Sequence, residues 1–143
     1  MAYRTRLVIR FGDLDPAGIV YYPRYLHFCH VAMEEFFHDA VGIDYPTLLA
    51  EHRLGFPTVH LESDYRRPLR YGDELEIEVV VARLGSSTVE WRYRFYHRGL
   101  ADPAAESRIV TVAVDMSTFT KMAVPEWLAA RLRATQGDNA PAG

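Results

Sequence analysis

The chain has little of what several classes of protein require. Its 143 residues contain one cysteine, Cys29, which excludes an intramolecular disulfide framework and fits a reducing compartment. No apolar run approaches the roughly eighteen residues of a membrane-spanning helix, and the N-terminal segment lacks the apolar stretch of a signal peptide. The net charge of -3 is unlike the basic balance of a general nucleic-acid binder. We therefore expect a single cytoplasmic domain with no nucleic-acid or membrane partner.

Familiar catalytic and cofactor patterns are also missing. The sequence has no Gly-x-Ser-x-Gly elbow of a serine hydrolase and no Walker-type or Rossmann glycine pattern. His27 and His30 have the i, i+3 spacing that can occur in a helical metal site, but no Glu-x-x-His pair or cysteine cluster accompanies them. We favour the interpretation that these histidines line a pocket or lie in the core. We expect no metal and no cofactor.

Hydrophobic periodicity indicates where helices and strands lie in one domain of residues 1–135. From Pro23 to about Val41, apolar residues recur every three or four positions, which predicts a long, largely buried helix that ends at Gly42. Elsewhere apolar and polar residues alternate, as they do in half-buried strands. The predicted strands span 3–11, 56–65, 75–81, 89–95 and 110–116, and two short helices span 44–52 and 125–133.

The alternation also predicts which residues share a face and how the domain is built. Ile9 and Phe11 belong to the apolar face of the first strand, and Val110 and Val112 to that of the last. One buried helix and a succession of antiparallel strands give an α+β architecture, most simply a sheet wrapped around the helix. Residues 136–143, rich in Gly, Ala and Pro, are expected to be a disordered tail.

The connection between the first strand and the long helix, residues 10–23, holds more special residues than a turn needs. It contains two acids, Asp13 and Asp15, with two glycines, two prolines and two tyrosines. The start of a helix presents free backbone N–H groups. A carboxylate facing the N–H groups around Tyr22 would place a nucleophile or general base beside an oxyanion donor. The alternative makes both acids turn or capping residues.

Two further charged groups have both a structural and a functional reading. Glu34 and Glu35 flank the apolar stripe of the long helix, either as a solvated or subunit-facing edge, which we favour, or as a second acid in the same cleft. Arg66, Arg67 and Arg70 form a local basic cluster. Such a cluster is usually solvated, but it could hold the phosphates of an anionic ligand.

Residues Phe11–Tyr25 closely resemble the signature of hotdog-fold acyl-CoA thioesterases, with the 4-hydroxybenzoyl-CoA thioesterase family as the nearest match. The segment Asp64–Asp73 also resembles that family, and the likeness extends more loosely over residues 3 to about 120. It implies a hotdog fold, in which an antiparallel sheet wraps around one long central helix. It also implies a homo-oligomer, a dimer or tetramer, with sites at the subunit interface.

The resemblance implies that Asp15 is the catalytic carboxylate, which attacks the thioester carbonyl or activates water, and that the backbone N–H of Tyr22 polarises the thioester oxygen. A thiolate leaves readily, since a thiol has a pKa of roughly 8.5, so no metal is required. His30 stands where the 4-hydroxybenzoyl enzyme has an acid that grips the substrate's phenol, and Gly85-Ser86-Ser87 stands where it has a basic run for the CoA nucleotide. The substrate-binding residues expected on this basis are Tyr25, His30, His60, Arg67, Arg70 and Ser87.

The leading hypothesis is therefore hydrolysis of a small acyl-CoA, aromatic or short-chain, to free acid and CoA. One alternative is a hydrolase of acyl-carrier-protein thioesters, or a housekeeping enzyme like the Tol-Pal-associated thioesterases. Another is a non-catalytic acyl-CoA binding module. A hotdog dehydratase is disfavoured, because no His and Glu pair stands in the expected motif context.

Overall fold

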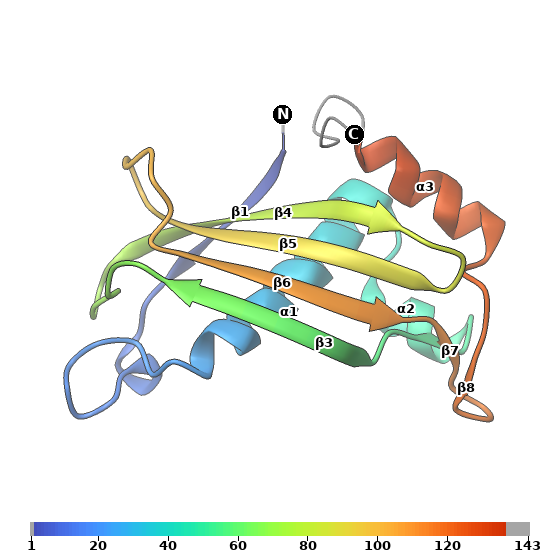
Figure 1. Ribbon diagram of the computed structural model, residues 1–143, viewed down its shortest axis with the longest axis horizontal. Coiled ribbons are helices and arrows are strands. Elements are labelled where there is room, and N and C mark those ends of the chain that lie inside the picture. The colour runs from blue at the N-terminus through green and yellow to red at the C-terminus, as the bar shows by residue number, and fades with distance from the viewer. Residues whose placement is uncertain (1, 137–143) are drawn as a thin grey trace.

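A five-stranded antiparallel sheet curves around one long helix, α1, in the computed structural model, which describes residues 2–136 (Figure 1). The order of the strands across the sheet is β1-β4-β5-β6-β3. This arrangement confirms the predicted α+β architecture and its sheet wrapped around a central helix. The strands are β1 (Tyr3–Val8), β3 (Thr58–Tyr65), β4 (Glu74–Leu84), β5 (Thr88–His97) and β6 (Ala105–Val112).

Helix α1 (Arg24–Phe36) is buried along one side because apolar residues recur on that side at helical spacing. Its chain continues through one wider, π-helical turn, η2 (Phe37–Val41). Gly42 then ends the helix with φ +84°, a left-handed conformation that glycine adopts without steric cost. The predicted stop at Gly42 is therefore confirmed. The buried side chains of α1 are Tyr25, Phe28, Cys29, Ala32, Met33 and Phe36.

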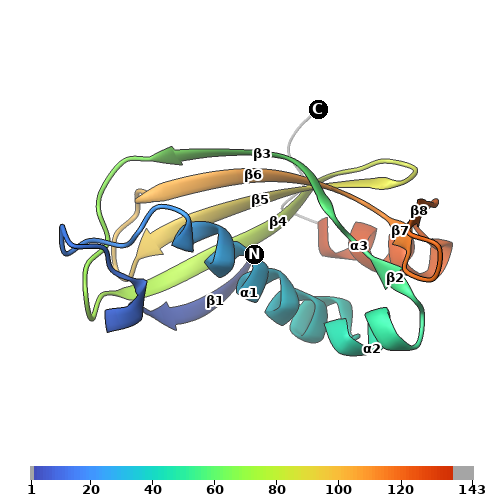
Figure 2. The ribbon, with the colours of Figure 1, turned by 90° about the horizontal axis from the view of Figure 1, so that it is seen from below.

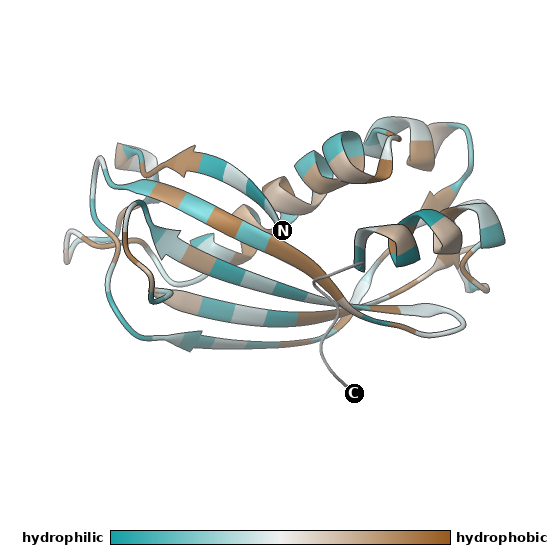
Figure 3. Ribbon diagram, turned by 90° about the horizontal axis from the view of Figure 1, so that it is seen from above, coloured by the Kyte–Doolittle hydropathy of each residue, from teal (hydrophilic) through white to brown (hydrophobic). Residues whose placement is uncertain are grey.

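Aromatic rings join α1 to the middle of the sheet. The rings of Phe36 and Trp91 are 5.6 Å apart and nearly perpendicular, and those of Tyr25 and Phe95 are 5.3 Å apart in the same arrangement. The Trp91 indole N–H donates to the Thr111 hydroxyl at 2.9 Å, so this buried polar group has a partner. Figure 2 shows the sheet curving over α1, and Figure 3 shows polar and apolar residues alternating along the strands.

The first strand is shorter than predicted. Strand β1 ends at Val8, and Phe11 opens a short 3₁₀ turn, η1 (Phe11–Asp13), with 75% of its side chain exposed. The Ile9 N–H donates to the Asp73 carbonyl oxygen, and Ile9 is fully buried. The predicted inward position is therefore correct for Ile9 and wrong for Phe11, because the turn begins between them.

The last predicted strand is in fact two strands, and its inward face was misassigned. Strand β6 ends at Val112, and β7 (Val114–Asp115) belongs to a separate three-stranded sheet with β2 (Leu54–Gly55) and β8 (Thr120–Lys121). In β6 the buried residues are Ala105, Ser107, Ile109 and Thr111, while Val110 and Val112 lie half-buried on the outer face. Because the inner face carries small or polar residues and the outer face carries two valines, hydrophobicity alone indicates the wrong face.

The short helices also differ slightly from the expectation. Helix α2 (Tyr45–Ala50) starts at Asp44, whose carboxylate accepts the Thr47 N–H at 2.8 Å. Helix α3 (Glu126–Gln136) runs further than predicted, and the Gln136 side-chain amide donates to the Val81 carbonyl oxygen at 2.9 Å. Gln136 is thus ordered, contrary to the prediction, and the rest of the predicted tail lies outside the described residues. Within residues 2–136, no helix is long and apolar enough to span a membrane.

Candidate active site

The connection between β1 and α1 folds into a miniature hairpin that projects beyond the end of the sheet (Figure 2). The Tyr21 N–H donates to the Asp13 carbonyl oxygen, and the Asp15 N–H donates to the Ile19 carbonyl oxygen, both at 2.9 Å. The chain reverses between them, where the Gly18 N–H donates to the Asp15 carbonyl oxygen at 2.9 Å. Gly18 has φ +80°, which a residue with a side chain adopts only with strain.

Asp15 stabilises this reversal with one oxygen of its carboxylate. Its Oδ1 accepts the Ala17 N–H at 2.9 Å, the geometry of an Asx turn. The alternative interpretation of Asp15 as a turn residue is therefore confirmed, and its catalytic role stays a prediction. No ion pair among residues 2–136 includes Asp15, which is half-buried, so its carboxylate lies close to solvent with no cationic side chain bound to it.

Asp13 is buried and holds the hairpin to the helix. Only 7% of the residue is exposed, and its two carboxylate oxygens have different donors. One accepts the Arg10 N–H at 2.9 Å, and the other accepts the Arg24 Nε–H at 2.8 Å. The predicted structural role of Asp13 is thereby confirmed.

The start of α1 leaves one backbone donor free. The Tyr21 N–H bonds to the Asp13 carbonyl oxygen and the Arg24 N–H bonds to the Tyr21 carbonyl oxygen, while Pro23 has no N–H. Between them, the Tyr22 N–H donates to no backbone carbonyl of residues 2–136. The dipole of the helix adds positive potential at this end. Tyr22 therefore offers a hydrogen bond to an anionic or polarised oxygen.

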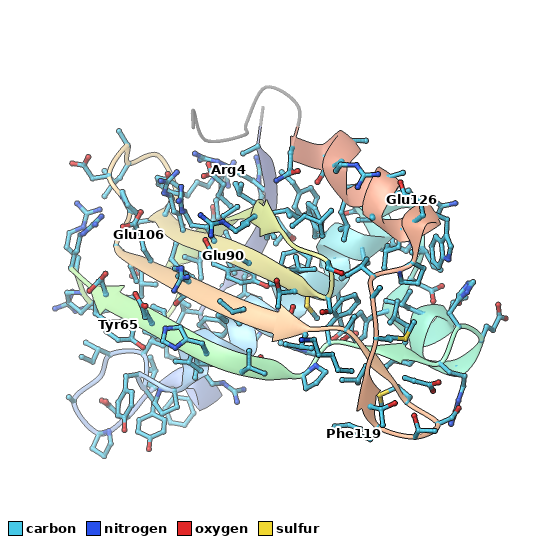
Figure 4. The ribbon with its side chains drawn as sticks, turned by 45° about the vertical axis from the view of Figure 1, so that its right-hand side comes forward. Arg4, Tyr65, Glu90, Glu106, Phe119 and Glu126 are labelled. Atoms are coloured by element: carbon cyan, nitrogen blue, oxygen red, sulfur yellow. The ribbon has the colours of Figure 1, made fainter. Side chains whose placement is uncertain are left out.

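A hollow of about 430 Å³ is lined by Tyr22 and its neighbours. Tyr25 and Tyr65 also line it, their rings lie 4.9 Å apart and edge to face, and the Tyr65 hydroxyl donates to the Tyr22 carbonyl oxygen at 3.4 Å. Figure 4 shows Tyr65 at the end of β3, beside the projecting hairpin. Burial raises the pKa of Tyr25 to about 12, so its hydroxyl stays protonated at neutral pH. The hollow is lined by Ile19, Val20, Tyr22, Tyr25, Tyr65, Arg66, Arg67 and Pro68.

The three arginines of the predicted basic cluster make different contacts. Arg67 lines the hollow and donates to the Asp102 carbonyl oxygen, whereas Arg66 forms an ion pair with Glu106 at 2.6 Å. Arg70 lies next to the hairpin because its backbone pairs with Ile19. Of the three, Arg67 and Arg70 are the exposed guanidinium groups without a carboxylate partner in the described part of the chain.

Three predicted substrate-binding residues do not reach this hollow within one protomer. His30 is exposed on α1 and lies 3.1 Å from the Glu34 carboxylate. His60 is exposed on β3 and lies 2.8 Å from the Glu62 carboxylate. Ser87 sits in the β4–β5 hairpin, at the opposite end of the sheet from the projecting hairpin (Figure 1). Among residues 2–136, no three His, Cys, Asp or Glu side chains gather as a metal-binding group.

The sequence assigns no site role to four residues that line the hollow, Ile19, Val20, Tyr65 and Pro68. Tyr65 is predicted on a strand, although it directly precedes the arginine cluster that could bind a ligand. Asp15, by contrast, is absent from the lining of the hollow among the described residues. The hollow and the carboxylate are therefore neighbouring parts of one loop, joined through Ile19 and Val20.

Residues 9–132 match the family model described as the thioesterase-like superfamily. The chain belongs to this superfamily. It is 35% identical over 134 residues to the 1,4-dihydroxy-2-naphthoyl-CoA hydrolase of Synechococcus elongatus, across 93% of this chain and 96% of that protein. The hydrolase of the same name from Nostoc punctiforme is 30% identical over 141 residues, across 96% of this chain and 93% of that protein.

A solved structure agrees with this membership at the level of the fold. The 1,4-dihydroxy-2-naphthoyl-CoA thioesterase from Synechocystis superposes with a TM-score of 0.83 at 18% identity, covering 99% of this chain and 100% of that chain. The thioesterase described here thus has the hotdog fold. Its relatives are hydrolases of CoA thioesters, and the chain is an enzyme of that type, an acyl-CoA thioesterase.

Proposed function

We propose that this thioesterase hydrolyses an aromatic acyl-CoA. Its acyl group would be a hydroxylated bicyclic ring, like the dihydroxynaphthoyl group in the names of the relatives from Synechococcus and Nostoc. The observation that carries the proposal is the hollow lined by Tyr22, Tyr25 and Tyr65, together with a Tyr22 N–H that donates to no backbone carbonyl of residues 2–136. Aromatic walls favour a flat aromatic acyl group, because offset and edge-to-face contacts stabilise it beyond simple burial. A short aliphatic acyl group would leave such a hollow partly unfilled.

In this proposal Asp15 is either the general base or the nucleophile of the hydrolysis. As a general base it takes a proton from water while the water oxygen bonds to the thioester carbon. As a nucleophile it forms a mixed anhydride, which water then hydrolyses. In both routes the carbonyl oxygen becomes an oxyanion that accepts the Tyr22 N–H, and the C–S bond breaks to release CoA as a thiolate. Loss of one such donor typically lowers a rate by about 10²–10³-fold.

A second copy of the chain completes the site in this proposal. Tyr22, Tyr25 and Arg67 share the hollow, whereas His30, His60 and Ser87 lie apart from it in one protomer. Among the described residues, strand β3 pairs on one side only, with β6, and it carries the exposed apolar side chains of Val59, Leu61 and Tyr65. Such an edge favours pairing with another chain. A dimer or tetramer through this edge would place residues of one protomer at the hollow of its partner.

The CoA phosphates are assigned to Arg67 and Arg70 in the same proposal. Both guanidinium groups are exposed, and both lie beside the projecting hairpin. Phosphate oxygens match the planar donor set of arginine well. Ser87 and His60 are proposed to contact the substrate from the other protomer.

A substrate panel tests this function. Purified protein is mixed with 1,4-dihydroxy-2-naphthoyl-CoA, 4-hydroxybenzoyl-CoA, butyryl-CoA and an aromatic acyl group on a carrier protein, and free thiol is measured over time. We expect kcat/KM for the aromatic CoA thioesters to exceed that for butyryl-CoA by at least about 100-fold, a difference of about 2.7 kcal/mol in transition-state stabilisation. Faster turnover of butyryl-CoA contradicts the aromatic assignment, and faster turnover of the carrier-bound group supports the carrier-protein alternative instead.

A further inference from the structure

The Tyr22 N–H is held in place by a closed ring of three hydrogen bonds. The Asp13 carboxylate accepts the Arg24 Nε–H at 2.8 Å, and the Arg24 backbone N–H donates to the Tyr21 carbonyl oxygen at 2.8 Å. The Tyr21 N–H then donates to the Asp13 carbonyl oxygen at 2.9 Å. The ring thus begins and ends at Asp13.

The position of this ring matters because of peptide geometry. The Tyr21 carbonyl and the Tyr22 N–H belong to one planar peptide unit and point in opposite directions. Fixing the Tyr21 carbonyl oxygen against the Arg24 N–H therefore fixes the direction of the Tyr22 N–H. Because Arg24 is anchored to Asp13, and Asp15 follows Asp13 by two residues, the ring also sets the position of this donor relative to the Asp15 carboxylate.

We propose that Asp13 and Arg24 are positioning residues, which hold the Tyr22 N–H and the Asp15 carboxylate in the geometry that hydrolysis requires. This inference rests on the proposed roles of Asp15 and Tyr22. Neither side chain touches the substrate, so neither is a catalytic residue. We expect both residues to affect the rate by stabilising the transition state, because an oxyanion donor must lie within about 2.7–3.1 Å of the developing charge.

Burial and two hydrogen bonds hold Asp13 in the position that this role needs. Asp13 is 7% exposed and both of its carboxylate oxygens have donors, so it cannot turn to release one bond while keeping the other. The Arg24 side chain is 42% exposed and reaches Asp13 through a single donor, Nε. Arg24 is therefore the more accessible member of the pair for substitution.

The experiment compares Arg24→Met and Arg24→Lys with a matched control, Arg4→Met. Arg4 also pairs with carboxylates, Glu76 at 3.3 Å and Glu78 at 3.2 Å, and 41% of its side chain is exposed, close to the 42% of Arg24. Figure 4 labels Arg4 on β1, well separated from the projecting hairpin. Stability is followed by thermal unfolding and activity by thiol release from the best aromatic CoA thioester of the panel.

We expect Arg24→Met to lower kcat by about 10- to 100-fold, since a misplacement of about 1 Å at a reacting centre can cost on the order of 10²-fold. KM should stay within about threefold, because the lost interaction acts in the transition state. Arg24→Lys should recover part of the rate, and Arg4→Met should keep kcat within about twofold. Binding of a thioether analogue of the substrate, which has no thioester carbonyl, should be unchanged in all three variants.

Two results overturn the inference. One is a folded Arg24→Met protein with the kcat of the parent, and the other is an equal loss of kcat in Arg24→Met and Arg4→Met. If Arg24→Met does not fold, the activity of Arg24→Lys tests the inference, because a folded Arg24→Lys protein with full kcat also contradicts the positioning role.

The variant Asp15→Asn separates this inference from the proposed function. If Asp15→Asn is inactive and the Arg24 variants keep the kcat of the parent, only the positioning role is refuted. If Asp15→Asn is active, the proposed function is refuted.

Discussion

The Asp15 carboxylate combines an observed structural contact with a proposed catalytic role. One oxygen accepts the Ala17 N–H and stabilises the hairpin, while the carboxylate as a whole has no ion-pair partner among residues 2–136. Asp13, two residues earlier, is the opposite case, buried and bound on both oxygens. Two identical side chains in one loop thus differ in exposure and partners, which is the usual way that a protein separates a reactive acid from a structural one.

Two buried residues of α1 predict how stability depends on pH. Burial raises the pKa of the Cys29 thiol from 9.0 to about 12 and that of the Tyr25 hydroxyl from 10.0 to about 12. Because both folded pKa values lie above the unfolded ones, the neutral forms stabilise the fold fully below about pH 9. That stabilisation is lost as the pH rises from about 9 toward 12.

We expect the urea midpoint to fall between about pH 8 and about pH 10.5, with Cys29 contributing on the order of 2 kcal/mol of the loss. Cys29→Ala removes the titrating thiol, so its midpoint should fall less steeply over the same interval. The comparison uses the slope with pH within each protein, since the substitution also changes packing. Equal slopes in the two proteins would contradict this account.

At the scale of the element, the two edge strands of the sheet are protected differently. The exposed side chains of β1 include Arg4 and Arg6, and charged residues discourage pairing with another chain. Strand β3 instead exposes Val59, Leu61 and Tyr65, with 61%, 46% and 47% of each residue accessible. Contact with a second chain therefore favours the β3 edge.

We expect Leu61→Lys to weaken self-association and to lower kcat/KM, because the proposed site is completed by a second protomer. Size-exclusion chromatography with light scattering gives the mass in solution. Leu100→Lys is the matched control, since Leu100 is 50% exposed in the β5–β6 loop. A monomeric parent protein, or an unchanged mass for Leu61→Lys, would show that β3 is not the interface.

The elements also show where sequence patterns are sufficient. The long helix, its stop at Gly42 and strands β4 and β5 follow from periodicity, because the helix and both strands have a strongly apolar side. The break at Ala113 between β6 and β7 could not be predicted in that way, because Val110, Val112 and Val114 continue the alternation through it. The small sheet of β2, β7 and β8 was missed since its strands are two residues long and carry no repeat.

At the scale of the whole molecule, the motif predicted the loop but not its internal bonds. Residue types indicated that Asp15 and Tyr22 mattered, whereas the ring through Asp13, Arg24 and Tyr21 depends on backbone directions that no pattern encodes. The separation of His30, His60 and Ser87 from the hollow likewise depends on how the strands and helix are placed. If the site is shared between protomers, as proposed, the periodicity of one chain does not predict it.

The most direct test of the central claim is the turnover number of Asp15→Asn for the best aromatic CoA thioester. Asparagine keeps an oxygen that can accept the Ala17 N–H, so the hairpin should persist. Asp115→Asn is the matched control, because Asp115 accepts the N–H two residues on, from Ser117, at 2.8 Å in the same kind of turn. We expect kcat to fall by about 10²–10⁴-fold in Asp15→Asn, as for the loss of a catalytic acid or base, and to stay within about twofold in Asp115→Asn. A folded Asp15→Asn protein with the turnover of the parent would contradict the account.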